Sequence, residues 1–369
     1  MSLAPVLANP SRDAACSSGP SPTRKSVHLI GPGRVGRAVL RELADLPVRL
    51  VAVSDSTATV FAREGLDAHA LAEWKESGRR LSEHEQSAGV PLDVALDVFS
   101  ADLVVDCSDS CLEPAARARS RERARGLLRR GRTLLLAAKT PLLGAEIGNE
   151  RGGGHGGADE LLDAIASGRI NVNAVFDSAD HTIARELTTL RDDATALACV
   201  ANATTTALVS ALERGRSFDE GCAWARALGL LERDPTQDLD GRDAALKLAL
   251  IASLWLGRRF EPDAVVRRGE QADARALDPD LLRERRDRGA TTRLVGRATR
   301  DGELALAYEE VAAGSALAVP ASHVSYSFAL AGGATRVFLG DGLGPQKTAR
   351  ALVTDLAAHL SCVPRRVAA

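Results

Sequence analysis

The sequence predicts an α/β protein built from two domains, and three observations lead to this prediction. At 369 residues the chain is long enough for two domains, each with its own core. Residues 26–147 alternate short apolar runs with amphipathic helix patterns, which is typical of an open parallel sheet. Between residues 160 and 340, helix patterns are mixed with alternating strand patterns, which is typical of an α+β domain.

Composition narrows the class of protein further. The chain is 45% hydrophobic and 26% charged, as globular proteins usually are. A formal net charge of -2 and an aromatic content of 3% argue against a surface for nucleic acid or anionic membrane. No apolar run reaches the length of a membrane span, and the six cysteines are scattered without zinc-site spacing. We therefore expect a cytoplasmic protein with free thiols and no metal ligands.

A glycine-rich motif follows the first predicted strand, the apolar run "VHLI". Gly31, Gly33 and Gly36 have the spacing G-x-G-x-x-G, and an amphipathic helix pattern comes next. The first glycine permits a tight turn, the second lets backbone approach a pyrophosphate, and the third packs helix against strand. The helix N-terminus offers N–H groups to the phosphates. The motif predicts a Rossmann-type dinucleotide-binding domain, with Arg34 and Val35 beside the cofactor.

The second predicted strand, "VRLVAVSD", ends on Asp55, nineteen residues after Gly36. A carboxylate at this position accepts hydrogen bonds from the adenosine ribose and favours NAD. Arg34, inside the glycine loop, instead favours the 2′-phosphate of NADP. The two residues point to different cofactors, so the prediction is NAD(P).

Two further strands are predicted to end at the same sheet edge. The segment "ADLVVDCSDS" (101–110) is a strand that leads into a small polar loop with Ser108, and a helix is expected at 115–130. The next strand lies in "TLLLAAKTPL" and is followed by Lys139. Ligands bind at the carboxyl edge of an open α/β sheet. Lys139 is therefore either a ligand-binding residue or a solvated loop charge.

The domains are predicted to be discontinuous in sequence. Residues 1–25, rich in Ser, Pro and Ala, are expected to be a disordered leader. The tail from residue 336 has a strand, a glycine loop and an amphipathic helix pattern, so we expect it to return to the first domain. The dinucleotide-binding domain would then comprise 26–147 with 336–369. Residues 148–335 would form the substrate and dimerisation domain.

The stretch "ERDPTQDLDGRDAALK" combines many carboxylates with one of only five lysines in the chain. It has the features of a helix start, since Asp238 or Asp240 can cap it and Gly257 can end the helix. Asp243 and Lys247 are four residues apart and can pair. A helix start does not explain why Lys247 lies among leucines, so an active site is the alternative interpretation.

With these residues in view, the chain resembles the homoserine dehydrogenase family. The family's catalytic helix carries Leu-Gly-x-x-Glu-x-Asp-Pro-x-x-Asp-Leu-x-Gly-x-Asp-x-x-x-Lys, which "LGLLERDPTQDLDGRDAALK" (228–247) matches position by position. The resemblance extends over roughly residues 27–362, through the glycine motif, the "DCSDS" loop, the "AAK" lysine, the "NATTT" segment and the "GDGLG" tail. The stretch "RDRGATTRLVGRATRDGELALAYEEV" is similar to the dehydrogenase part of aspartokinase–homoserine dehydrogenases. A chain with the dehydrogenase function alone is expected.

The resemblance implies reversible NAD(P)-dependent reduction of L-aspartate 4-semialdehyde to L-homoserine, in the biosynthesis of threonine, methionine and isoleucine. It implies a homodimer joined through the substrate domain. Lys247 would be the catalytic acid/base and Lys139 a second lysine near the reacting oxygen and the cofactor. Asp243 would take part in catalysis and substrate binding, and Asp238 would orient the reaction. Glu232 would bind the substrate ammonium.

The resemblance also implies a substrate contact for Thr204 and a set of residues that bind the cofactor. These are Gly31, Gly33, Arg34, Val35, Gly36, Asp55, Ser108, Lys139 and Gly342.

The sequence departs from the family pattern at three places. Ala138 replaces the usual asparagine before the lysine, and Ala203 replaces a glycine in the threonine segment. The family's glycine-rich loop beside the cofactor and a monovalent-cation site is replaced by "DSADHTIA" (177–184). These departures leave two alternatives open: an oxidoreductase for another small amino or hydroxy aldehyde, or a cofactor-binding relative without catalysis.

Overall fold

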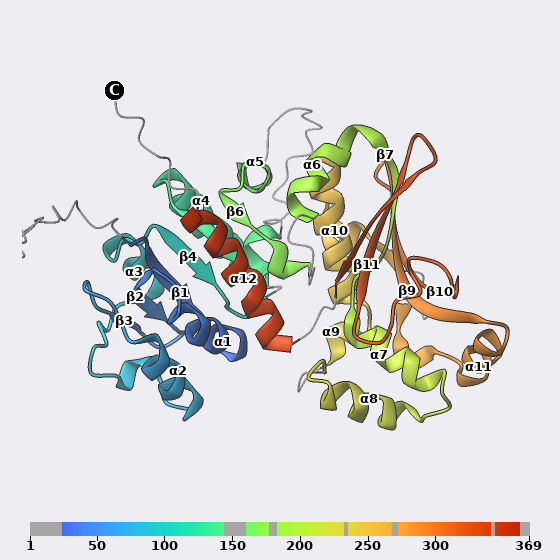
Figure 1. Ribbon diagram of the computed structural model, residues 1–369, viewed down its shortest axis with the longest axis horizontal. Coiled ribbons are helices and arrows are strands. Elements are labelled where there is room, and N and C mark those ends of the chain that lie inside the picture. The colour runs from blue at the N-terminus through green and yellow to red at the C-terminus, as the bar shows by residue number, and fades with distance from the viewer. Residues whose placement is uncertain are drawn as a thin grey trace, which may run out of the picture.

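The structure, a computed structural model, contains two six-stranded sheets with helices packed on each, and the predicted α/β class is confirmed (Figure 1). It describes residues 24–111, 113–143, 160–176, 183–231, 235–267, 272–340 and 344–361. The predicted leader lies almost wholly outside these residues, as do Glu232, Gly342 and most of the 177–184 loop.

The first sheet has the strand order β3-β2-β1-β4-β5-β6, in which all neighbours are parallel except the edge strand β3. Its strands are β1 (Ser26–Ile30), β2 (Arg49–Ser54), β3 (Thr59–Phe61), β4 (Leu103–Asp106), β5 (Thr133–Leu136) and β6 (Ile170–Asn171). The central strands are buried on both faces because helices cover both, which is why they consist of nearly continuous apolar runs.

Six helices accompany this sheet. They are α1 (Arg34–Leu43), α2 (Ala68–Glu76), α3 (Leu92–Val98), α4 (Pro114–Arg129), α5 (Glu160–Ala166) and α12 (Gly344–Ser361). Helices α1, α2 and α12 share an apolar core with Leu29, Val105 and Leu135 of the strands. Helices α3, α4 and α5 pack with Val104 and Leu136, which point to the opposite face.

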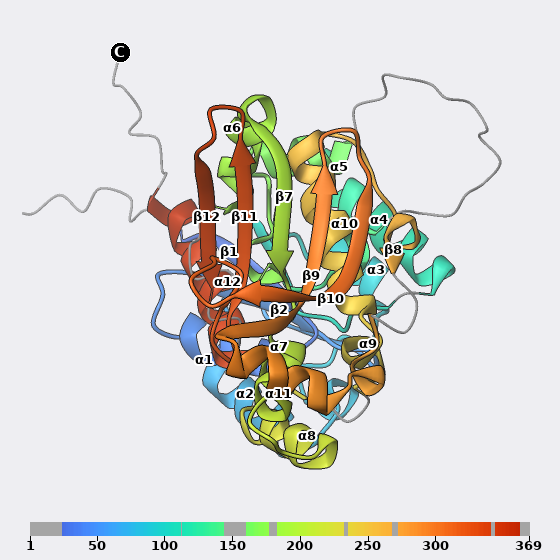
Figure 2. The same ribbon diagram turned by 90° about the vertical axis from the view of Figure 1, so that its right-hand side faces the viewer.

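The second sheet has the order β12-β11-β7-β9-β10-β8 and is antiparallel except for the pair β8 and β10. Its strands are β7 (Ala194–Val200), β8 (Val266–Arg267), β9 (Ala290–Thr299), β10 (Leu304–Ala312), β11 (Val324–Leu330) and β12 (Thr335–Gly340). The helices are α6 (Ile183–Asp193), α7 (Ala203–Leu212), α8 (Phe218–Ala227), α9 (Thr236–Leu239), α10 (Arg242–Leu256) and α11 (Pro279–Asp287). Figure 2 looks onto this sheet with the buried helix α10 behind it.

The predicted domain boundaries differ from the sheets at two places. Strand β6 lies within the predicted second domain but pairs with β5 of the first sheet. Strand β12 lies almost wholly within the predicted first domain but pairs with β11 of the second sheet. A strand of two residues is too short for its period to be recognised, and an edge strand has the same pattern in either sheet.

Helix α12 returns to the first sheet, where it packs on α1 (Figure 1). Polar contacts hold its second half. Asn173 donates from Nδ2 to Asp355 at 2.8 Å, and Asn171 Nδ2 lies 2.8 Å from His359 Nε2.

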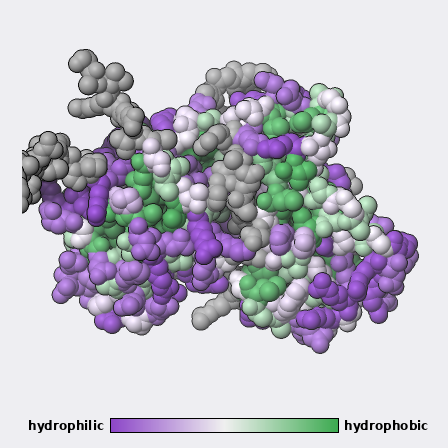
Figure 3. Space-filling model, in the orientation of Figure 1, coloured by the Kyte–Doolittle hydropathy of each residue, from purple (hydrophilic) through white to green (hydrophobic). Residues whose placement is uncertain are grey.

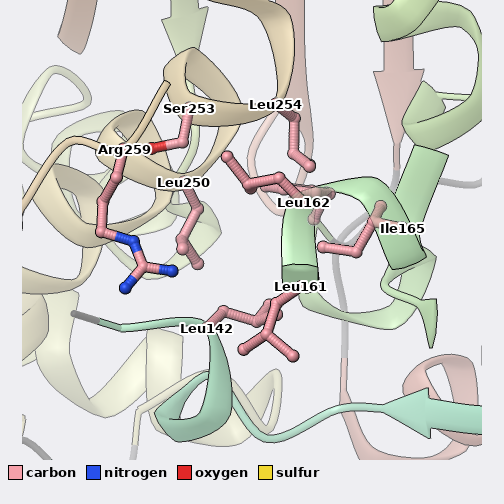
Figure 4. Close-up of a pocket in the computed structure, with 9 residues that line it drawn as sticks. Leu142, Leu161, Leu162, Ile165, Leu250, Ser253, Leu254 and Arg259 are labelled. Atoms are coloured by element: carbon pink, nitrogen blue, oxygen red, sulfur yellow. The ribbon is translucent and has the colours of Figure 1, made fainter. Parts of the chain in front are cut away.

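The two units share a continuous apolar core beside α10. Figure 4 shows Leu142, Leu161, Ile165, Leu250 and Leu254 converging from three segments of the chain. The space left among them is about 10 Å³, close to the size of one water molecule. This junction is therefore packed protein and not a ligand site. On the face shown in Figure 3, hydrophilic side chains predominate, and apolar side chains form smaller patches on both units.

No helix within the described ranges has the length and apolar character needed to cross a bilayer.

The first sheet contains a buried polar chain. His28 Nε2 is hydrogen-bonded to Ser54 Oγ at 2.7 Å, and Ser54 Oγ to Thr59 Oγ1 at 2.7 Å. His28 is fully buried, and its Nδ1 has no partner among the described residues. Burial lowers the pKa of His28 to about 4. Its ring is therefore neutral in the folded protein at pH values where an unfolded histidine is protonated.

We expect His28 to make the protein acid-sensitive. Between pH 6.5 and about 4 the unfolded chain binds a proton that the folded chain does not, so stability falls as pH falls, by up to roughly 3 kcal/mol. Denaturant unfolding of His28→Gln should lose this part of the pH dependence. The exposed His69→Gln is the matched control and should keep it. If the free energy of unfolding fell equally steeply with pH in the wild type and in His28→Gln, the expectation would be contradicted.

Candidate active site

The glycine loop has the geometry that a bound dinucleotide requires. Gly31 is left-handed, with φ +77°, and a Cβ there would lie 2.6 Å from the backbone nitrogen of Ser108. A Cβ on Gly36 would lie 2.2 Å from the carbonyl oxygen of Gly31, so the helix packs directly on the loop. Gly33 faces open space, with nothing within 4 Å of its Cβ position. No side chain caps α1, so its first N–H groups face this space.

A cavity of about 420 Å³ lies at the carboxyl ends of β1, β2 and β4. Gly31, Asp55 and Ser108 line it, together with the segment Gly89–Leu92. Arg34, the first residue of α1, is exposed, and Val35 is half-buried against the core. The residues present therefore fit a dinucleotide, whose pyrophosphate would lie at Gly33 and the start of α1.

Asp55 lies in this cavity, but its carboxylate oxygens already accept hydrogen bonds from groups of the protein. Its Oδ1 accepts from Thr57 N–H (2.7 Å), Thr57 Oγ (2.6 Å) and Ala58 N–H (3.1 Å). Its Oδ2 accepts from Lys75 Nζ (2.7 Å) and Leu81 N–H (3.2 Å). Burial alone would raise its pKa, but these hydrogen bonds lower the pKa of Asp55 to about 2. The predicted ribose acceptor is thus an ion-paired residue, and nothing in the sequence indicates its partner Lys75 on α2.

A second cluster joins the two units of the structure. Asp243, in the first turn of α10, lies 3.3 Å from Lys139 Nζ through Oδ1 and 3.5 Å from Lys247 Nζ through Oδ2. Lys139 follows β5 in the first sheet, whereas Lys247 is one turn further along α10. Asp238, on α9, is linked to Asp243 through the side-chain amide of Asn202, at 2.7 Å and 2.9 Å.

The local structure explains how these residues reach one another. Helix α10 is preceded by Gly241, its N-cap residue, whose φ of 77° lets the chain turn between α9 and α10. Of the two predicted caps, Asp240 accepts the N–H of Arg242 at 3.1 Å, while Asp238 points to Asn202 instead. Asp238 and Asp243 therefore face the same side from adjacent helices.

Two hydrogen bonds hold the loop that carries Lys139. The Lys139 N–H donates to Ser110 Oγ at 3.0 Å, and the Cys111 N–H donates to Thr140 Oγ1 at 2.8 Å. They tie the loops after β4 and β5 together at the carboxyl edge of the first sheet. This edge is where we predicted ligands to bind.

The cluster is largely withdrawn from water, and its charges perturb one another. The side chains of Lys247 and Asp243 are 6% and 16% exposed. Burial opposes the charge of Asp243, but the ammonium groups of Lys247 and Lys139 outweigh it and hold its pKa well below the usual range. Burial, and then the charge of Asp243, raise the pKa of Asp238 to about 6. Two neighbouring carboxylates thus differ widely in acidity.

The other predicted site residues lie elsewhere or outside the described residues. Thr204 is buried in α7 and its hydroxyl donates to the carbonyl of Leu230 at 3.2 Å. Glu232 and Gly342 are not described. Asn202 was not among the predicted site residues: it has an N-cap signature in the sequence, but nothing there indicates its contact with Asp238. Within the described ranges, no three His, Cys, Asp or Glu side chains are grouped as a metal site would need.

This arrangement suits a reduction or oxidation of a small polar molecule. The cleft for a dinucleotide and Lys139 both lie at the carboxyl edge of the first sheet, and Lys139 shares Asp243 with the buried Lys247. An ammonium group can protonate or stabilise an oxygen that gains negative charge. The carboxylates can hold a positively charged group of the same ligand.

Comparisons with known proteins agree with this chemistry. The family model for homoserine dehydrogenase matches residues 182–357. A model for Glutamate/Leucine/Phenylalanine/Valine dehydrogenase matches residues 12–119, which include the glycine loop. The chain is 27% identical over 358 residues to an NAD(+)-dependent homoserine dehydrogenase of Pseudomonas canavaninivorans, covering 90% of this chain and 96% of the relative. It is 26% identical to a homoserine dehydrogenase of Methanocaldococcus jannaschii, covering 89% and 96%.

Solved structures share the fold. A hyperthermophilic archaeal homoserine dehydrogenase in complex with NADPH has a TM-score of 0.70 at 19% identity, covering 92% of this chain and 98% of that one. A putative homoserine dehydrogenase of Archaeoglobus fulgidus has a TM-score of 0.67 at 19% identity, covering 91% and 99%.

We expect Asp238→Asn to stabilise the protein at neutral and alkaline pH. The folded protein holds the Asp238 proton up to about pH 6, so its ionisation above that pH costs stability that a neutral amide avoids. The gain should be roughly 2 kcal/mol above pH 7 and should vanish as pH falls towards 4. Denaturant unfolding across this range measures it. Asp240→Asn, which weakens the start of α10, is the matched control and should give no such gain.

Proposed function

We infer that this chain is a homoserine dehydrogenase, which interconverts L-aspartate 4-semialdehyde and L-homoserine with NAD(P). The observation that supports this most strongly is the placement of Asp243 between Lys139 and Lys247. The three groups lie where the sheet edge of the glycine motif meets the segment that matches the family model. Such a protein serves the biosynthesis of threonine, methionine and isoleucine, and we place it in the cytoplasm.

The lysines supply what the reaction needs at the carbonyl oxygen. When bound, the nicotinamide ring supplies or accepts the hydride. Lys247 then protonates the oxygen as negative charge develops on it, and Lys139 stabilises the same charge. Asp243 stays ionised, because the two ammonium groups hold its pKa well below the usual range, and its two oxygens keep both lysines in place. In the reverse direction, Lys247 would act in its neutral amine form and accept the hydroxyl proton of homoserine.

The carboxylates favour an amino aldehyde over a hydroxy aldehyde. A substrate ammonium leaves water on binding and needs carboxylate partners. Asp238 offers one beside Asp243, and we assign Glu232 to the same task on the strength of the family resemblance. A bound ammonium would also favour the ionised form of Asp238 and so offset the effect of its burial.

We further propose a homodimer joined through the second sheet. Val337, Ser327, Ala198, Arg297 and Ala305 are paired directly across five strands and so share one face. Helix α10 packs on the opposite face, and Figure 2 shows the outer face without a covering helix. The row consists mostly of small residues, as a surface that meets a second sheet requires.

Turnover of L-homoserine with NAD⁺ or NADP⁺, followed by absorbance of the reduced nicotinamide, tests the proposed function. Lys247→Ala should lower kcat by at least about a hundredfold, because a general acid is removed. Lys25→Ala is the matched control, since Lys25 lies at the opposite end of β1 and donates to the carbonyl of His359. Absence of turnover in the wild type would refute the function, and a near-normal kcat in Lys247→Ala would refute the role.

The Asp55–Lys75 pair should control the choice of cofactor. Lys75→Ala leaves the Asp55 charge uncompensated in the cavity, which repels a 2′-phosphate and frees Oδ2 for a ribose hydroxyl. We expect the Kd ratio of NADP⁺ to NAD⁺, measured by calorimetry, to rise at least about tenfold. Arg41→Ala removes another ion pair between α1 and α2, that with Glu76, and should leave the ratio unchanged. An unchanged ratio in Lys75→Ala would contradict the expectation.

A further inference from the structure

The side chain of Asn202 performs two separate tasks. Asn202 caps α7, and its Oδ1 accepts the N–H of Thr205 at 2.8 Å. A backbone N–H can only donate, so the amide oxygen must face the helix and the NH₂ group must face away from it. The orientation of this amide therefore follows from its hydrogen bonds.

The NH₂ group of Asn202 bridges the two site carboxylates. Nδ2 lies 2.7 Å from Asp238 Oδ1 and 2.9 Å from Asp243 Oδ2. An amide nitrogen has two hydrogens, so each carboxylate receives one. Asn202 itself is 3% exposed, which leaves little water to replace either bond.

This bridge determines how Asp243 is presented to the lysines. Oδ2 of Asp243 accepts the hydrogen bond from Asn202 and pairs with Lys247, and Oδ1 pairs with Lys139. The carboxylate therefore cannot rotate without breaking the bond to Asn202. The other hydrogen bond of the Asn202 NH₂ group keeps Asp238 beside Asp243, although the two negative charges repel each other.

We propose that Asn202 is a positioning residue that holds Asp238 and Asp243 side by side, so that one carboxylate faces the substrate ammonium while the other orients both lysines. The inference rests on the proposed function and deepens it. Asn202 acts through the carboxylates.

The requirements of the cap alone do not explain an asparagine here. A cap uses only the side-chain oxygen, and serine or aspartate supplies that oxygen as well as asparagine does. The NH₂ group is needed only by the carboxylates. The two tasks can therefore be separated by substitution.

Asn202→Ser keeps a capping oxygen but lacks the NH₂ group, whereas Asn202→Ala lacks both. We expect Asn202→Ala to have the lower Tm, and both variants to lose at least about tenfold in kcat with L-homoserine at pH 7. The acidic limb of the kcat/KM profile should shift upward by about one pH unit in Asn202→Ser, because a hydrogen bond that lowers the pKa of Asp238 is gone.

Two further variants complete the experiment. Ser217→Ala removes the capping box of α8 and should lower the Tm without changing kcat or the pH profile. Asn202→Asp keeps shape and cap but adds a third carboxylate, so it should be the most impaired variant at pH 8. It also provides the test if Asn202→Ser does not fold.

The outcomes separate the two proposals. If the wild type does not turn over L-homoserine, both the proposed function and this inference are refuted. If the wild type is active and Asn202→Ser or Asn202→Asp has the same kcat and the same acidic limb, only the positioning role is refuted. If kcat fell in proportion to Tm in every variant, including Ser217→Ala, the result would show that Asn202 acts only as a helix cap.

Discussion

The site depends on one interaction, the ionised carboxylate of Asp243 between two lysine ammonium groups. Lys247 is almost fully buried, and burying a charged group without a partner of opposite charge costs much free energy. Asp243 is that partner at 3.5 Å, and its other oxygen lies 3.3 Å from Lys139. Lysine also matters here because it can act as an acid and a base, which the far more numerous arginines of this chain cannot do near neutral pH.

That contact also links the two units of the structure. Lys139 follows β5 of the parallel sheet, and Asp243 begins the helix that packs on the antiparallel sheet. The apolar junction beside it is packed with almost no free volume, so the relative position of the two groups is well supported. A charged contact of this kind needs such support, since its strength depends on distances that a loose junction would not maintain.

The cofactor cleft shows how a correct motif can still lead to an incomplete assignment. The glycine spacing predicted the strand, turn and helix, and the close approach of Gly36 to Gly31 explains why glycine is required. The acid after the second strand also lies in the cleft, at Asp55. Its pairing with Lys75 changes its chemistry, because a carboxylate with five donors is a weak acceptor for a ribose. Lys75 is twenty residues away along the chain, and only folding reveals the pair.

The sequence by itself determined the α/β class, the glycine loop, the helix that carries Asp243 and Lys247, and the resemblance to homoserine dehydrogenases. These features depend on local spacing, which periodicity and motifs record directly. The tertiary structure alone decided that Lys139 reaches Asp243, that Asn202 bridges two carboxylates and that Thr204 turns to Leu230. It also decided the sheet to which β6 and β12 belong. Such contacts join residues far apart in the chain, and each is selected by packing and charge pairing in three dimensions.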